Sequence, residues 1–287
     1  MKEMFKMEKP QGASCGTANR KNSQDHLDAS VKGSLEKIKN KFLVMSGKGG
    51  VGKTSVSVNI AIALADKGFK VGLMDVDIHG PDVPRMLGLN GMLDLNENRK
   101  LIPMQYSENL AAVSLEALIP NKDDAIIWRG PMKHNVIRQF VSDVEWGNLD
   151  YLIIDSPPGT GDEPLTVAQT ISDAKAIIVT TPQEISLADV RKSINFCKTV
   201  CLEIFGIVEN MSGFVCPHCG ETADLFGSGG GEKTAHAFGI PFLGKIPFDP
   251  KVVSCGDAGK SYRAVHPDSP VTKAFDTIAD KIRDAGV

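Results

Sequence analysis

The sequence predicts an α/β fold in which a mostly parallel sheet carries helices on both of its faces. Short apolar runs of strand length alternate with helical segments from residue 42 to the end of the chain. A glycine-rich stretch, GKGGVGKT, stands between the first apolar run and the first helical segment. Strands that are apolar throughout are typical of parallel sheets, which are buried on both faces. The 287 residues suit one large α/β domain.

Each predicted element follows from its own residues. Short apolar runs bounded by polar or turn residues indicate strands at residues 42–46, 70–75, 110–114, 151–155, 176–181, 204–209 and 241–246. Longer stretches with helical character predict helices at residues 54–68, 131–144, 186–201, 231–239 and 269–286. Gly68 is suited to end the first helix, and Ser269 followed by Pro270 is suited to begin the last.

The alternation of strands and helices divides the chain into two parts. Residues 1–40 are polar, lysine-rich and without apolar periodicity, so we expect a flexible N-terminal arm. Residues 41–287 then form one domain. Residues 211–231 interrupt the alternation as an insertion-like loop that carries a Cys-x-x-Cys pair, and its glycine-rich end, FGSGGGE, indicates a flexible hinge.

Charge and hydropathy bear on whether the protein is membrane-spanning, secreted or bound to nucleic acid. No stretch approaches the roughly 20 apolar residues that a membrane span needs, and the N-terminus has no apolar segment typical of a secretory signal. The net charge of −3 and the lack of a long basic run give no linear sign of a nucleic-acid partner. We therefore expect a soluble, cytoplasmic protein that binds neither nucleic acid nor membrane.

The stretch from Gly47 to Thr54 matches the phosphate-loop pattern G-x-x-x-x-G-K-[ST] between a predicted strand and a predicted helix. Its glycines allow backbone N–H groups to surround phosphate oxygens at the positive end of a helix dipole. Lys53 is predicted to bridge the terminal phosphates of ATP, and the Thr54 hydroxyl to bind Mg²⁺. The nucleotide-binding residues predicted for the loop are Gly47, Gly49, Gly50, Val51, Gly52, Lys53, Thr54 and Ser55.

Acidic residues follow two other predicted strands. Asp75 ends the second strand and Asp77 lies two residues beyond, while Asp155 ends the strand YLIID. Parallel strands place such ends beside the phosphate loop. We expect Asp155 to hold Mg²⁺ through water, Asp75 to assist the metal shell, and the N–H of Gly159 to point toward the γ-phosphate. Asp77 resembles the switch residue of such enzymes, which orients the attacking water.

Lys48, directly after the first glycine, makes the loop a deviant form of the motif. It resembles the signature lysine of the MinD/ParA/nitrogenase-reductase class, the deviant Walker A (SIMIBI) class of P-loop NTPases. In that class the lysine of one subunit reaches the nucleotide of the other. The resemblance therefore implies a homodimer that sandwiches ATP, with Lys48, Lys53 and Asp77 as the catalytic residues.

Cys216 and Cys219, in CPHCG, supply two thiolates, whereas zinc and iron–sulfur clusters usually take four ligands. A two-fold dimer would bring together four sulfurs, two from each chain. Sulfur ligands suit zinc and a cluster equally. A redox role is disfavoured, because the pair does not lie at a strand-to-helix turn. Cys197 and Cys201 share a predicted helical face, and we interpret both as core residues.

The chain from residue 42 onward resembles the Mrp/ApbC family of P-loop ATPases, which act as iron–sulfur cluster carriers. The stretches that carry the resemblance are SGKGGVGKT, DVDIHGP, WRGPM, WGNLDYLIIDSPPGTGD, GIVENMSGFVCPHCG and IPFDP. The resemblance implies that Cys216 and Cys219 hold a labile [4Fe–4S] cluster between subunits, that Asn210 contacts the adenine base, and that cluster donors and apo-protein acceptors are partners.

One feature departs from part of that family. Eukaryotic cytosolic scaffold members carry several N-terminal cysteines for a second cluster, whereas here residues 1–40 contain only Cys15. We therefore expect no second cluster, which favours a prokaryotic homodimeric carrier. Two alternatives remain: a nucleotide switch whose dimer is bridged by structural zinc, and a partitioning ATPase of the ParA/MinD kind.

Overall fold

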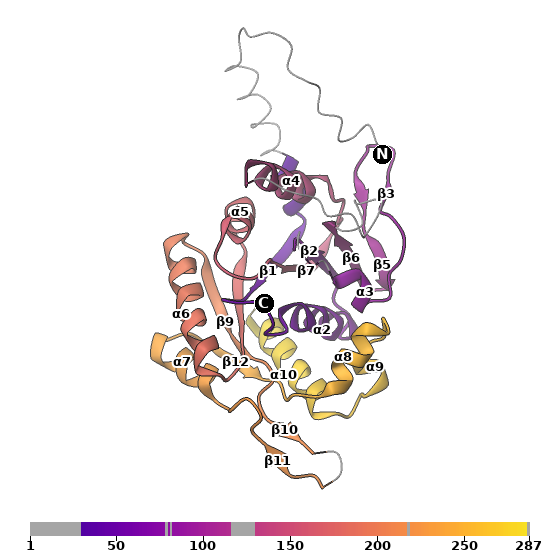
Figure 1. Cartoon of the computed structure of the whole chain (residues 1–287). Helices are drawn as coiled ribbons and strands as arrows, with labels where there is room; N and C mark the ends of the chain where they lie inside the picture. The colour runs from indigo at the N-terminus through magenta and orange to yellow at the C-terminus, as the bar shows by residue number, and fades with distance from the viewer. Residues whose placement is uncertain (1–29, 78–79, 81, 116–129, 217–218, 286–287) are drawn as a thin grey trace.

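The computed structural model describes residues 30–77, 80, 82–115, 130–216 and 219–285. Its centre is an eight-stranded sheet in the order β12-β9-β8-β1-β7-β2-β6-β5 (Figure 1). All neighbouring strands pair in parallel except β5, which is antiparallel to β6. The strands are β1 (Ile38–Met45), β2 (Val71–Asp75), β5 (Met104–Ser107), β6 (Leu110–Ser114), β7 (Leu149–Asp155), β8 (Lys175–Thr180), β9 (Glu203–Glu209) and β12 (Phe242–Lys245).

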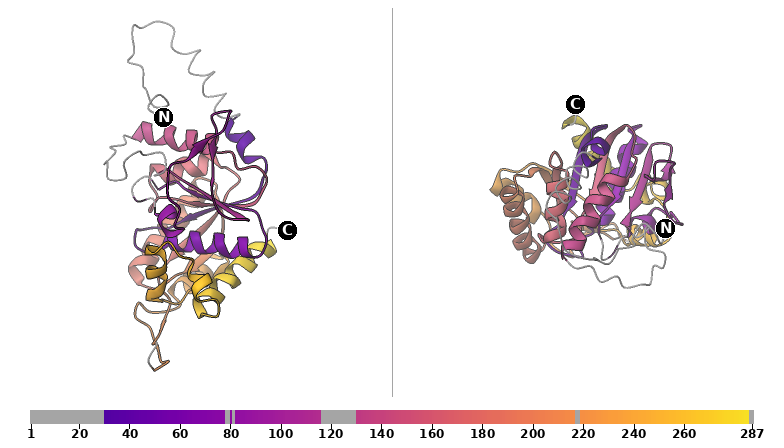
Figure 2. Two further views of the ribbon diagram at one scale, coloured as in Figure 1. Left: turned by 90° about the vertical axis from the view of Figure 1, so that its right-hand side faces the viewer. Right: turned by 90° about the horizontal axis from the view of Figure 1, so that it is seen from above.

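Helices cover both faces of this sheet (Figures 1 and 2). They are α2 (Lys53–Asp66), α3 (Val83–Met86), α4 (Gly130–Asp143), α5 (Asp162–Thr170), α6 (Glu184–Thr199), α7 (Gly230–Phe238), α8 (Pro250–Asp257), α9 (Tyr262–Val265) and α10 (Pro270–Ala285). Two short antiparallel pairs lie outside the main sheet: β3 (Asp94–Leu95) with β4 (Leu101–Ile102), and β10 (Phe214–Val215) with β11 (Thr222–Ala223). No helix in the described ranges is both long enough and apolar enough to cross a membrane.

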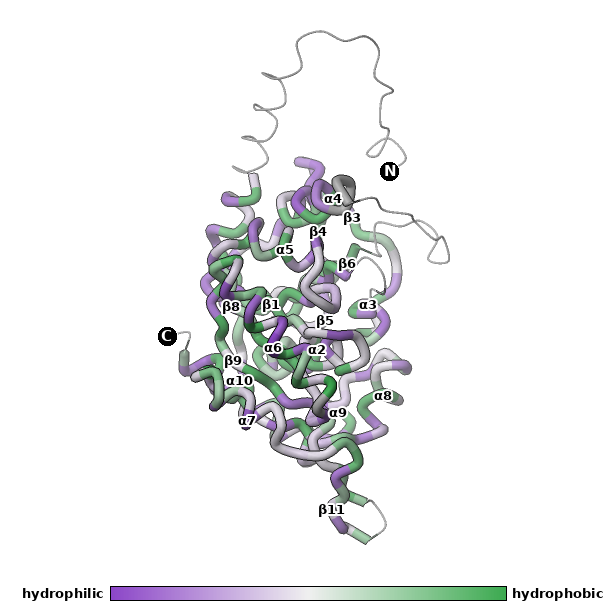
Figure 3. The backbone as a smooth tube through the Cα atoms, turned by 60° about the vertical axis from the view of Figure 1, so that its left-hand side comes forward, coloured by the Kyte–Doolittle hydropathy of each residue, from purple (hydrophilic) through white to green (hydrophobic). Residues whose placement is uncertain are grey.

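The sheet separates two hydrophobic clusters. Successive side chains of a strand point to opposite faces, so in β1 Leu43 and Met45 join the cluster under α4, α5 and α6, while Phe42 and Val44 join the cluster under α2 and α10. Hydrophobic segments concentrate inside the body, and the hairpin of β10 and β11 projects from one end of it (Figure 3). The mostly parallel sheet predicted from the apolar strands is confirmed.

The folded domain begins earlier in the chain than expected. Residues 30–35 are helical, and β1 already starts at Ile38. Val31 and Leu35 are only 6% and 7% exposed and belong to the cluster under α4. These two apolar residues stand at the helical spacing i and i+4 among polar residues, a pattern too short to predict a helix. The prediction of an arm up to residue 40 is therefore wrong for residues 30–40, and residues 1–29 lie outside the described part.

The glycine-rich run FGSGGGE is packed closely and does not form the hinge expected from its composition. Gly229 has the left-handed φ of 80° and stands at the N-cap of α7, whose first residue is Gly230. A Cβ on Gly230 would lie 2.7 Å from both Leu187 Cδ1 and the carbonyl oxygen of Pro182. Gly229 is therefore favoured by its backbone conformation, and Gly230 by the lack of space for a side chain.

The two cysteines assigned to one helical face have different surroundings. Cys197 is completely buried, with its sulfur 3.5 Å from that of Met45. Cys201 lies beyond the end of α6, with the left-handed φ of 57°, and is exposed. The prediction that Cys201 is a core residue is wrong, because the chain leaves the helix at Thr199 before the periodicity reaches it.

We predict that Cys197 and Cys201 of the native protein react at different rates with an alkylating reagent. Burial raises the pKa of Cys197 to about 12, so at pH 8 only about 0.01% of this thiol is ionised, and the thiolate is the reactive form. Iodoacetamide should label Cys201 and leave Cys197 unmodified, as read by peptide mass spectrometry. Labelling of both at similar rates in the folded protein would contradict this assignment.

Candidate functional site

The phosphate loop, Asp75 and Asp155 meet at the carboxyl edge of the sheet. The register pairs Asp75 of β2 with Asp155 of β7, and Asp155 in turn with Val44 of β1. The loop continues from the end of β1 into α2. Ligands of open α/β sheets bind at this edge, and the sequence-predicted residues are therefore brought together there.

The glycines of the phosphate loop are required for two different physical reasons, backbone conformation and lack of space for a side chain. Gly50 and Gly52 both have φ of 78°, a left-handed conformation that favours glycine. A Cβ on Gly47 would lie 2.4 Å from the carbonyl oxygen of Asp189, and one on Gly52 would lie 2.4 Å from Nδ2 of Asn210. The loop is thus tightly packed at Gly47 and Gly52 where it leads to the N-terminus of α2, the end of a helix that favours anions.

Asp155 is the centre of a compact polar group. Lys53 Nζ lies 2.6 Å from Asp155 Oδ2, and the Thr54 hydroxyl donates to the same oxygen at 2.8 Å. The Ser57 hydroxyl donates to Oδ1 at 2.6 Å. Asp155 and Ser57 are almost completely buried, so their hydrogen bonds are formed in a low dielectric. The residues predicted to bind phosphate and metal are in mutual contact.

Ser57 belongs to this group, although the motif does not include it. We predict that Ser57→Ala weakens Mg²⁺-dependent ATP binding and destabilises the fold by about 1–3 kcal/mol, because one buried carboxylate oxygen loses its donor. Ser193→Ala is the matched control, since that buried hydroxyl bonds only to the carbonyl oxygen of Asp189, one turn earlier. Thermal melting and nucleotide titration measure the two effects, and equal behaviour of both variants would refute the role of Ser57.

Asp75 lies beneath the phosphate site. It accepts hydrogen bonds from the backbone N–H groups of Asp77 and Val83 and from the Ser114 hydroxyl. Burial, together with the charge of nearby Asp155, raises the pKa of Asp75 well above its usual value. Asp75 therefore holds the backbone of Asp77 and Val83, and one acceptor position of Oδ1 is left for its predicted role in the metal shell.

The phosphate loop opens into a cavity of about 460 Å³. Lys48 and Asp77, predicted as catalytic residues, both line it, together with the loop from Gly49 to Ser55. Pro158, from the stretch SPPGTGD, forms another wall, and helices α3 and α8 contribute Arg85, Met86, Val252, Val253, Gly256 and Asp257. Sequence reasoning missed these residues because α3 and α8 reach the cavity only through tertiary packing.

Two further predicted residues are engaged within the protein. The N–H of Gly159 donates to the carbonyl oxygen of Ser46 at 2.8 Å, so the predicted bond to a γ-phosphate would require this bond to break. Asn210 Nδ2 donates to the carbonyl oxygen of Val51 at 2.9 Å and thus contacts the phosphate loop directly. Arg129 of the WRGPM stretch lies outside the described residues.

Cys216 and Cys219 lie in the connection between β10 (Phe214–Val215) and β11 (Thr222–Ala223), and this hairpin projects from the body of the protein (Figure 1). The N–H of Cys216 donates to the carbonyl oxygen of Glu221, and the N–H of Gly220 to that of Cys216, which closes the turn. Cys216 is partly buried and Cys219 is exposed. In the described parts of the chain no group of three or more metal-binding side chains occurs. The hairpin presents the pair outward, where a second chain or another protein can reach it.

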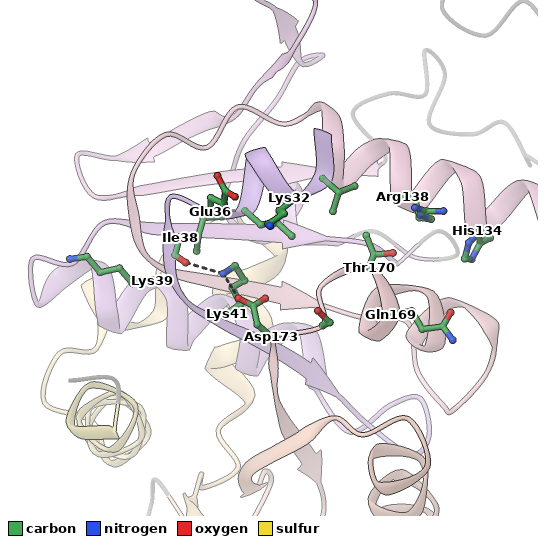
Figure 4. A pocket seen from close by; sticks show the side chains of 13 residues that line it. Lys32, Glu36, Ile38, Lys39, Lys41, His134, Arg138, Gln169, Thr170 and Asp173 are labelled. Carbon is green, nitrogen blue, oxygen red and sulfur yellow. Dashed lines mark hydrogen bonds and ion pairs between the residues drawn. The ribbon is translucent and has the colours of Figure 1, made fainter. Parts of the chain in front are cut away.

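A second cavity, of about 700 Å³, lies at the opposite, amino edge of β1 and β8. Figure 4 shows Lys41 in its wall, bonded to the carbonyl oxygen of Ile38 and to Asp173 at 2.7 Å. Lys39 is paired with Asp150 at 2.8 Å. Since these two ammonium groups are already paired, and the described residues that line this cavity include no glycine-rich loop, we expect nucleotide to bind in the cavity at the phosphate loop instead.

Comparison with known proteins identifies the family. A model of ParA-type proteins, described as the NUBPL iron-transfer P-loop NTPase, matches residues 37–283. The chain belongs to the iron-transfer P-loop NTPases. This assignment confirms the resemblance drawn from the phosphate loop and the CPHCG stretch, and it places the NTPase in the MinD/ParA class.

Relatives of this NTPase match it over most of their length. An iron-sulfur cluster carrier protein of Saccharolobus solfataricus is 48% identical over 257 residues, covering 89% of this chain and 87% of the relative. The cytosolic Fe-S cluster assembly factor NUBP2 of Bos taurus is 44% identical over 259 residues, covering 88% and 96%. Archaeal carriers and eukaryotic factors are thus similar to it at nearly the same level.

Solved structures confirm the fold. A nucleotide-binding protein of Archaeoglobus fulgidus in complex with ADP has a TM-score of 0.74 at 38% identity, covering 86% of this NTPase and 95% of that chain. The cell division ATPase MinD of Pyrococcus furiosus has a TM-score of 0.63 at 25% identity, covering 86% and 99%.

Proposed function

We propose that this NTPase hydrolyses ATP and carries a labile [4Fe–4S] cluster, which it holds between two copies of the chain and transfers to apo-proteins. The observation that supports the proposal most is that one chain combines a lined phosphate-loop cavity with a thiol pair on a projecting hairpin. The names of its relatives, an iron-sulfur cluster carrier protein and a cytosolic Fe-S cluster assembly factor, agree with both sites and with action in the cytoplasm.

The nucleotide chemistry rests on the residues around the cavity. Lys53 and the N–H groups of the loop would bind the phosphates, and Asp77 would orient the water that attacks. The Thr54 hydroxyl and the Asp155 carboxylate, whose oxygens lie 2.8 Å apart, together offer the oxygen ligands that suit Mg²⁺. When bound there, Mg²⁺ would neutralise charge on the β- and γ-phosphates.

Exposed apolar side chains support a second copy of the chain as the partner. Val253 is 60% exposed beside the cavity, Ile185 is 75% exposed at the same edge of the sheet, and Val215 and Leu225 of the hairpin are 46% and 55% exposed. Coverage by a second chain would remove such apolar side chains from water. A dimer on this side would bring Lys48 toward the neighbouring nucleotide and place four thiolates together.

Anaerobic purification followed by iron, sulfide and zinc analysis and a visible spectrum tests the proposal. We expect broad absorption near ~400 nm and about four irons per dimer, the content of a cubane cluster on four thiolates. Stoichiometric zinc without any uptake of iron would replace the carrier function with a zinc-bridged nucleotide switch. The family assignment favours the carrier over a partitioning ATPase.

A further inference from the structure

Two consecutive residues at the end of β9 connect the phosphate loop with the base of the cysteine hairpin. Asn210 holds the loop, because its Nδ2 donates to the carbonyl oxygen of Val51 at 2.9 Å. The N–H of Asn210 donates to the carbonyl oxygen of Thr180 at the end of β8. Any movement of the loop around Val51 and Gly52 therefore acts directly on Asn210, whose amide is in contact with both.

Glu209, the preceding residue, holds both ends of the hairpin segment. Its side chain is completely buried. Oε1 accepts from the Ser212 hydroxyl at 2.5 Å and from the N–H of Gly229 at 2.8 Å, and Oε2 accepts from the N–H of Gly231 at 2.5 Å. Ser212 lies where the chain enters the hairpin, and Gly229 lies where it returns to α7. One carboxylate thus fixes the entry and the exit together.

The base of the hairpin is rigid enough to transmit a displacement. A Cβ on Gly231 would lie 3.0 Å from Glu209 Oε2 and 3.0 Å from Thr180 Cγ2, which leaves little free space around the carboxylate. Phe248 packs against Phe214 and Phe226 with ring centroids 6.1 Å and 5.8 Å apart. Because the base is packed in this way, a shift of Glu209 would be passed on to the hairpin.

We propose that Glu209 is a positioning residue that transmits nucleotide binding at the phosphate loop, through Asn210, to the orientation of Cys216 and Cys219. This inference rests on the proposed function, in which the loop binds nucleotide and the thiol pair binds the cluster. The coupling acts within one chain and adds to any effect of dimerisation. It predicts that nucleotide changes the accessibility of the two thiols even when no cluster is bound.

The test measures thiol labelling of the full, chelator-treated chain with and without Mg·ADP. In the wild type we expect Mg·ADP to change the iodoacetamide labelling rates of Cys216 and Cys219 at least about fivefold, the lower end of common coupling between sites. In Glu209→Gln the side-chain NH2 group replaces an acceptor oxygen and faces groups that themselves donate hydrogen bonds. The ratio of the labelling rates with and without Mg·ADP should therefore fall to about one. The Kd for Mg·ADP should stay within about twofold of the wild-type value. Cys201, exposed at the far end of α6, is the internal reference and should label at a constant rate.

Glu203→Gln is the matched control, because it makes the same change on the same strand at an exposed residue that pairs with Lys175. It should keep the wild-type ratio. Should Glu209→Gln fail to fold, Ser212→Ala removes only one of the three donors and is expected to reduce the ratio by at least half.

The outcomes separate the coupling from the proposed function. Normal binding of Mg·ADP with no change in wild-type labelling, or a wild-type ratio retained in Glu209→Gln or Ser212→Ala, would overturn the coupling alone. Loss of Mg·ADP binding in the wild type would refute the nucleotide site and the coupling with it. Iron analysis of the same preparations shows independently whether the cluster function holds.

Discussion

Replacement of Lys53 by alanine is expected to lower kcat for ATP hydrolysis by about 10²–10³-fold, the usual loss when one preorganised charge contact to the transition state is removed. Lys53 is the first residue of α2 and is only 6% exposed. Its ammonium group lies 2.6 Å from Asp155 and 3.3 Å from the Thr54 hydroxyl. In the proposed function it would lie where the negative charge of the transferring phosphoryl develops. Steady-state phosphate release measures the effect.

A second consequence of Lys53→Ala concerns the fold. The substitution leaves buried Asp155 without its ammonium partner, and an uncompensated buried charge is costly. Thermal melting must therefore accompany the kinetics. Lys175→Ala is the control, because this lysine pairs with Glu203 at the amino edge of the sheet, away from the phosphate loop. A variant that folds and hydrolyses ATP at the wild-type rate would refute the assignment of the phosphate loop.

Replacement of Cys216 or Cys219 by alanine is expected to reduce bound iron to background while Mg·ADP binding is retained. Each substitution removes two of four thiolates in a dimer, and a cubane cluster needs four ligands. The hairpin projects from the body (Figure 2), so the loss of a thiol there leaves the phosphate loop intact. Iron and sulfide analysis after anaerobic reconstitution gives the result.

Cys201→Ala is the matched control for this experiment, since it removes an exposed thiol that lies beyond α6 and outside the hairpin. It should bind as much iron as the wild type. Full iron occupancy in the Cys216 or Cys219 variant would exclude the pair from cluster binding, and other residues would then have to be the ligands.

Local sequence was sufficient for most of the fold and for the nucleotide site. GKGGVGKT between an apolar run and a helix predicts its own conformation, because the glycines and the helix start are determined within a few residues. Asp155 could be placed beside the loop because parallel strands end at a common edge. The family assignment followed from such stretches, which are read without knowledge of distant contacts.

Contacts between residues that are far apart in the chain could not be predicted from local sequence. Nothing in the sequence around Ser57 indicates a bond to Asp155. The composition of the glycine-rich run at Gly229 predicts a hinge, but Glu209 and Leu187 pack against this run in the folded chain. Cys201 followed the helical period, but the helix ends before it. The sequence alone predicted seven of the eight strands of the main sheet, all except β5, together with the phosphate loop and the thiol pair, since each of these depends on neighbours in the chain. Only the tertiary structure decided that Glu209 and Asn210 join the two sites, because strand register and helix packing bring together residues that the chain keeps far apart.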